Sequence, residues 1–141
     1  MIVFEIKGQP MGKQRPKFAR VGNYTRTYTP KETINYEILV KMCYQNQCKA
    51  YFGSRPINVR IMAYYKIPIN YSKKKKEMCL NGEIRPTTKP DADNIAKIIC
   101  DSLNGIAYDD DKQIVGLVVE KRYSTEPYVV VEIKEQENET D

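Results

Sequence analysis

The sequence of 141 residues contains no histidine and no tryptophan, and its cysteines show no CxxC spacing. Without histidine, Ser-His and Cys-His catalysis and imidazole-bound metals are excluded. A zinc site would have to use Cys43, Cys48, Cys79 and Cys100, whose spacing does not match zinc-binding motifs. Acid–base and metal chemistry must therefore come from carboxylates, lysines, tyrosines or water.

A long apolar run is also missing. No stretch approaches the ~20 apolar residues that span a bilayer. The start, residues 1–7, alternates like a strand and lacks the charged-then-apolar layout of a signal peptide. We therefore expect a cytoplasmic protein with no membrane partner. The length favours a single domain at 1–134, followed by an acidic tail at 135–141 that we expect to be frayed or disordered.

Apolar periodicity predicts an α+β domain in which a mixed sheet of about four strands packs against two main helices. The strands are expected at residues 2–7, 57–65, 113–122 and 127–134, where apolar and polar residues alternate. Residues 8–31 are broken by glycine and proline, and residues 68–90 are polar. Both of these segments are predicted to be loops.

The first helix is predicted to start with Thr29 as N-cap and Pro30 at the first helical position, with Glu32 completing a capping box. The second should begin near Asp91 or Asp93 and end at Asn104-Gly105. Helical spacing assigns each helix an apolar face towards the core. These faces are Ile34, Ile38, Leu39, Met42 and Cys43 in the first helix, and Ile95, Ile98, Ile99 and Leu103 in the second.

Aspartates are concentrated around the second helix. Asp91 and Asp93 stand in the run Lys-Pro-Asp-Ala-Asp-Asn at 89–94, and Asp109, Asp110 and Asp111 follow the helix. The whole chain nevertheless carries a formal charge of +5. Such oxygen-rich clusters suit a hard divalent cation such as Mg²⁺. A basic protein with an acidic metal cluster indicates an enzyme that attracts and cuts a polyanion, and nucleic acid is the obvious one.

Helix capping and calcium binding account for less of this aspartate pattern. A single aspartate could cap a helix or form a turn, but capping needs only one carboxylate. An EF-hand is excluded because the glycine expected at its sixth position is Ala96 when counted from Asp91 and Ile114 when counted from Asp109. A helix of ~11 residues is about 16 Å long. The two halves of the cluster could therefore meet through a return of the chain or across a subunit interface.

Positive charges collect in the segment at 8–31, which contains no acidic residue. They would either contact phosphates or solvate a loop. Lys97 lies one helical turn from both Asp93 and Asp101, so it could stabilise charge on a phosphate or form an ordinary i, i+4 ion pair. The cations of the segment are Lys13, Arg15, Lys17, Arg20, Arg26 and Lys31.

Several of these segments together resemble the RusA family of Holliday junction resolvases. The resemblance implies a small homodimeric endonuclease that nicks four-way DNA junctions symmetrically with Mg²⁺ or Mn²⁺. It covers nearly the whole chain apart from the tail. The segments that carry it are Gly12 to Lys17, Tyr28 to Pro30, Lys89 to Lys97, Asp101 to Gly105 and Tyr108 to Val115.

Carried over by position, the resemblance implies metal ligands at Asp91, Asp93 and Asp111, and a catalytic lysine at Lys97. Asp111 is chosen because the ligand in the family stands two residues before a glutamine, here Gln113. Where some members have arginine directly before the first aspartate, this chain has Lys89-Pro90. The residues expected to bind DNA are Lys13, Arg15, Lys17, Arg20 and Lys89.

Three functions compete at this point. The first is a Mg²⁺-dependent endodeoxyribonuclease that resolves Holliday junctions by paired nicks in recombination and repair. The second is a less selective metal nuclease acting on flaps, forks or RNA. The third is a basic nucleic-acid-binding module without catalysis. Dependence of cleavage on the metal separates the third from the other two.

Overall fold

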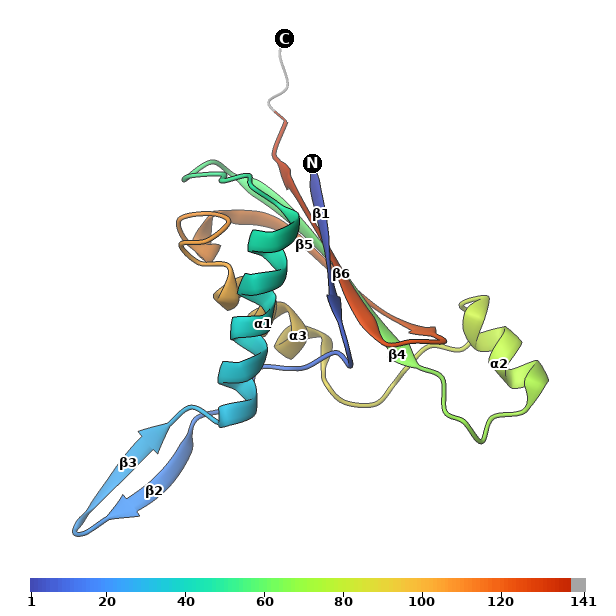
Figure 1. Cartoon of the computed structure of the whole chain (residues 1–141), viewed down its shortest axis with the longest axis horizontal. Helices are drawn as coiled ribbons and strands as arrows, with labels where there is room; N and C mark the ends of the chain where they lie inside the picture. Colours follow the sequence, from blue (N-terminus) through green and yellow to red (C-terminus); the bar gives the residue numbers. More distant parts are fainter. Residues whose placement is uncertain (138–141) are drawn as a thin grey trace.

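Four strands form a mixed sheet in the order β1-β6-β4-β5 (Figure 1). Strand β6 pairs antiparallel with β1 and β4, and β4 pairs parallel with β5. The computed structural model describes residues 1–137, so the end of the expected tail, 138–141, lies outside the described residues. The predicted α+β class and the four-stranded mixed sheet are confirmed. The strands are β1 (Ile2–Lys7), β4 (Ile57–Lys66), β5 (Ile114–Ser124) and β6 (Tyr128–Glu135).

Alternation along the strands separates a buried face from an open one. In β4, Ile57, Val59, Ile61 and Ala63 are buried, whereas the residues between them are at least partly exposed. Because side chains of a strand point to opposite faces in turn, the buried residues all lie beneath the helices. β1 and β6 contribute the remaining strand residues of this layer: Phe4, Ile6, Val129, Val131 and Ile133.

Helices α1 (Lys31–Gln47) and α3 (Ala92–Ser102) cover the buried face (Figure 1). The apolar stripe predicted for α3 is confirmed, since Ile95, Ile98, Ile99 and Leu103 are all buried. A short 3₁₀ helix, η1 (Asp111–Gln113), then leads into β5. Helix α3 and the aspartate run that follows it are therefore fixed to the core.

The predictions for the start and the apolar face of α1 are wrong. Pro30 occupies the N-cap position without a side-chain cap hydrogen bond, and helix α1 begins at Lys31. The buried residues are Thr33, Tyr36, Val40 and Tyr44. Aromatic rings bury more area than aliphatic side chains, and the Tyr44 ring packs edge-on against Phe4 with ring centroids 5.3 Å apart. The aliphatic side chains expected in the core consequently face outward.

The two predicted loops contain regular structure. Residues 17–28 form a hairpin of β2 (Lys17–Val21) and β3 (Tyr24–Tyr28), which projects from the body of the molecule (Figure 1). The connecting pair is Gly22-Asn23, and Gly22 adopts a φ of 59° that favours glycine. Helix α2 (Lys73–Leu80) lies in the second segment, where the Ser72 side chain accepts a hydrogen bond from the Lys75 amide at 3.2 Å.

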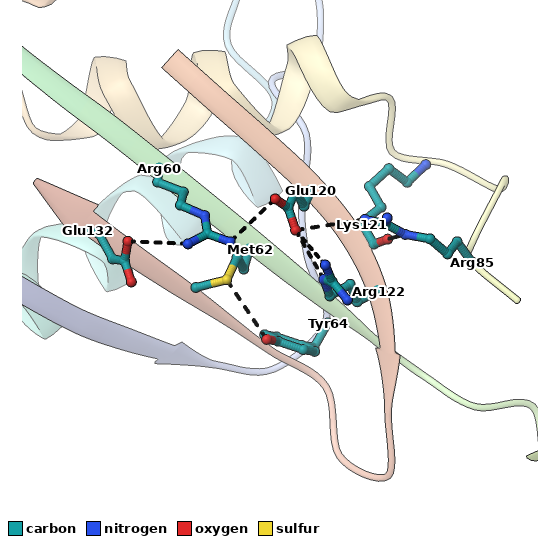
Figure 2. A network of polar contacts seen from close by, with 8 residues as sticks. All are labelled: Arg60, Met62, Tyr64, Arg85, Glu120, Lys121, Arg122 and Glu132. Carbon is teal, nitrogen blue, oxygen red and sulfur yellow. Dashed lines mark hydrogen bonds and ion pairs between the residues drawn. The ribbon is translucent and has the colours of Figure 1, made fainter. Parts of the chain in front are cut away.

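The open face of the sheet carries charges that neutralise one another (Figure 2). Glu120 pairs with Arg122 at 2.9 Å, with Arg60 at 3.3 Å and with Arg85 at 3.9 Å. A hydrogen bond from Arg122 is the main reason that the pKa of Glu120 is lowered. Arg60 also reaches Glu132 at 3.9 Å. With these arginines already paired, the open face is a poor surface for phosphates.

Candidate functional site

The first turn of α3 presents two carboxylates to solvent. Asp91 is the N-cap residue, but its side chain makes no cap hydrogen bond, and its backbone carbonyl accepts from the Ile95 amide at 3.0 Å. Asp93 follows in the first turn, and both aspartates are exposed. The positive end of the helix dipole favours negative charge at this position. Capping therefore does not explain the Asp91 side chain, which is free to bind a ligand.

The segment before the hairpin packs directly on the start of α3. The Lys13 amide donates to the Asn94 carbonyl at 2.9 Å. A Cβ atom on Gly12 would lie 2.8 Å from the Cβ of Pro90 and 3.0 Å from that of Asn94, so only glycine fits this approach. From the other side, the Tyr65 hydroxyl donates to the Pro90 carbonyl at 2.9 Å. Burial raises the pKa of Tyr65 to about 12, with the Asp91 charge a further cause. Tyr65 therefore remains a donor at neutral pH.

A hollow of about 770 Å³ opens beside Asp91. It lies between residues 10–17 and the turn before α3. Arg20 does not line it but stands on β2 in the hairpin. The structure thus brings most of the cations expected to bind DNA to the carboxylate. Those lining the hollow are Lys13, Arg15, Lys17 and Lys89.

Lysines of the site differ in how far their charge is matched. The ammonium of Lys13 is part-buried, 3.2 Å from Glu37 of α1 and 3.6 Å from Asp101 of α3. Lys97 is mostly exposed and pairs with Asp101 at 3.5 Å. Lys13 therefore holds the segment before the hairpin to both helices, whereas the single ion pair of Lys97 lies in solvent. Arg15 and Lys17 are exposed and point to no such structural role.

The three consecutive aspartates after α3 have different partners. Asp109 accepts a hydrogen bond from the Tyr51 hydroxyl. Asp110 caps η1, accepting from the Lys112 amide at 3.1 Å. Asp111 has a single long contact, 3.5 Å from the amide nitrogen of Asn104. Of the three, Asp111 is the carboxylate with most capacity left for a ligand.

Gln113 and Cys100 have structural roles beside this run. The Gln113 amide donates to the carbonyls of Gly53 and Arg55 at 2.7 and 2.8 Å. Burial raises the pKa of the Cys100 thiol to about 12. That thiol is therefore neutral at pH 7 and unsuited to act as nucleophile or metal ligand.

One chain does not gather the three predicted metal ligands. Asp91 and Asp93 stand at the N-terminal end of α3, and Asp111 lies beside Asn104 beyond its C-terminal end. A helix of this length spans about 16 Å. Within residues 1–137, no three acidic or thiol side chains stand close enough to hold a metal ion together. Asp91 and Asp93 suit a hard cation by their chemistry, but they form only part of a coordination shell.

The sequence profile of the family described as "Endodeoxyribonuclease RusA" matches residues 7–134. The chain belongs to the RusA family. It is also 35% identical over 136 residues to an uncharacterized protein, YqaN, of Bacillus subtilis (strain 168), with 95% of this chain and 96% of that protein covered. RusA membership indicates an endodeoxyribonuclease that acts on junction DNA, in a family that generally depends on a divalent metal.

Part of this RusA-family site went unnoticed in the sequence. The hairpin was missed, although the pair Gly22-Asn23 between two β-prone runs is a recognised hairpin signal. Tyr51 and Tyr65, which orient Asp109 and the turn before Asp91, carried no signal because their contacts depend on the tertiary fold. No helix within residues 1–137 is long and apolar enough to cross a membrane.

Proposed function

We propose that this chain is a Mg²⁺- or Mn²⁺-dependent endodeoxyribonuclease that resolves Holliday junctions by paired symmetric nicks. The observation that carries the proposal is the pair of uncapped carboxylates, Asp91 and Asp93, at the edge of a hollow lined by cations in a RusA-family chain. Cations around an acidic site attract a polyanion to the carboxylates that would otherwise repel it.

The chain's own side chains divide the work by chemistry. Arg15, Lys17 and Lys89 bind phosphates and position the strand without reading its sequence. Lys97, one turn after Asp93, supplies a positive charge that stabilises a phosphate in its transition state. A divalent cation held by carboxylates would supply a deprotonated water at neutral pH, which no histidine in this chain can do.

Two copies of the chain are required by this function. Nicking two opposing strands takes two active sites, which a twofold dimer supplies. The separation of Asp91 and Asp93 from Asp111 along α3 gives a second reason. We propose that Asp111 of one copy joins Asp91 and Asp93 of the other.

The direct test of the site is Asp93→Asn. We expect it to abolish cleavage of a synthetic four-way junction while leaving junction binding within about twofold, because the amide keeps the shape but loses the charge that holds a cation. The matched control is Glu126→Gln in the exposed turn before β6, which should cleave normally. Unchanged cleavage by Asp93→Asn would remove this carboxylate from the site.

Two other functions remain as outcomes of the same assay. A less selective nuclease would cut flaps, forks, RNA or linear duplex as well as the junction. A non-catalytic binding module would bind DNA without cutting it in any metal. The hollow and its cations would serve all three functions, so only the products distinguish them.

A further inference from the structure

The outward face of α1 carries a row of large apolar side chains in solvent. Ile34, Ile38, Leu39 and Met42 are 45%, 48%, 39% and 53% exposed. Ile34, Ile38 and Met42 follow one another at four-residue intervals, so they form one ridge along the helix. Contiguous exposed apolar surface on a folded protein marks an interaction site.

The chemistry of this face selects its partner. The other outward positions are Lys31, Asn35, Gln45 and Asn46, so a single charge stands at one end. A face without a row of cations does not suit DNA, whose affinity comes mainly from phosphate contacts. An apolar centre with a polar amide rim is the composition of a protein–protein interface.

We infer that this face joins two copies of the chain, with the two α1 helices antiparallel about a twofold axis near Ile38. The symmetry places Ile34 of each copy opposite Met42 of the other, so one patch is complementary to itself. Ridges at four-residue spacing interdigitate in the commonest class of helix packing. Although each chain carries +5, its face brings almost no like charge into contact.

The antiparallel arrangement also relates the two ends of α1 to the candidate site, and this step rests on the proposed function. After α1, the chain is tied to the aspartate run, since the Phe52 amide donates to the Ala107 carbonyl at 2.8 Å and the Asp109 amide to the Gly53 carbonyl at 2.9 Å. The hairpin precedes the other end of α1 (Figure 1). Antiparallel packing therefore sets the aspartate run of one copy at the end where the other copy's hairpin emerges.

The oligomeric state of the whole chain tests the interface without DNA or metal. Light scattering after size exclusion should give twice the chain mass of 16.4 kDa for the natural protein. Ile38→Glu should reduce the mass to one chain, with an unchanged circular dichroism spectrum, because the substituted side chain is already in solvent. The matched control is Ile69→Glu, at a position 81% exposed and outside α1, which should remain a dimer.

Cross-linking tests the axis independently of any loss of association. On oxidation, the Ile38→Cys variant should form a disulfide between two copies, well above the background from the natural cysteines, and Ile69→Cys should not. A monomeric natural protein, or a dimer that survives Ile38→Glu, would overturn the inference. A dimer that depends on Ile38 but cuts no DNA would leave the interface standing and reject the proposed function instead.

Discussion

At the residue scale, the hydrogen-bond partners of Asp109, Asp110 and Asp111 separate one functional candidate from two structural residues. Asp109 orients Tyr51, and Asp110 caps η1. Asp111 is left with one contact of 3.5 Å. Three identical neighbours in the sequence are thus distinguished by what the fold gives each of them.

Substitutions in this run should separate activity from stability. We expect Asp111→Asn to reduce the cleavage rate at least ~100-fold with little change in the free energy of unfolding. Asp110→Ala should instead cost about 0.5–2 kcal/mol of stability, because it removes the side chain that caps η1. Asp109→Asn keeps an oxygen for Tyr51 and serves as the control for charge. If Asp109→Asn inactivates the enzyme and Asp111→Asn does not, the third ligand has been misassigned.

Lys97 tests whether an ion pair is all that this residue provides. Its exposed pair with Asp101 is worth about 0.2–0.5 kcal/mol, so Lys97→Ala should barely change thermal unfolding. We expect the single-turnover rate to fall by about 10²–10³ while junction affinity falls only a few-fold. Asp101→Asn, which removes the same ion pair but keeps the lysine, should not cause a rate loss of this size. A rate loss that merely follows the unfolding midpoint would leave only the ion pair.

At the element scale, the hairpin and α2, both within segments predicted to be loops, change how the site is understood. The segment at 17–28 is a hairpin whose side chains are almost all exposed, so it contributes nothing to the core and is available to a ligand. An isolated two-stranded hairpin is marginally stable in water. Contact with DNA is the natural source of further order for this one.

The cations before and within the hairpin should divide by their protein contacts. Arg15→Gln with Lys17→Gln should weaken junction binding and reduce the slope of log affinity against log salt by about one for each phosphate that is no longer bound. Lys13→Gln should mainly lower stability, because Lys13 already pairs with Glu37 and Asp101. Fluorescence anisotropy over a salt series measures the affinities, and thermal unfolding measures the stability. A slope unchanged in the double variant would exclude these two residues from phosphate contact.

Period and burial decide which elements the sequence could predict. The strands and α3 were predictable because one strictly patterned face meets the core, as with Ile95 and Ile99. The face of α1 was not, since two apolar stripes compete and the fold buries the one containing Tyr36 and Tyr44. The aspartates were identified by residue type and family resemblance. Their separation along α3 depends on the tertiary structure, which no local pattern reports.

At the scale of the whole molecule, the two faces of the sheet have different roles. The helix-covered face holds the core and supports the carboxylates at both ends of α3. The open face pairs Arg60, Arg85 and Arg122 with glutamates and offers little free positive charge (Figure 2). We therefore expect DNA to approach from the side of the hollow and the hairpin, and two copies to present two such sides to one junction.

The measurement that tests the central claim most directly is cleavage of a synthetic four-way junction beside its matched linear duplex, each with Mg²⁺ and with a chelator. The account predicts symmetric paired nicks near the junction centre, with Mg²⁺ only and not on the duplex, while binding to the junction survives chelation. Equal cutting of both substrates would contradict junction selectivity. Binding without cutting in any divalent metal would contradict the nuclease itself.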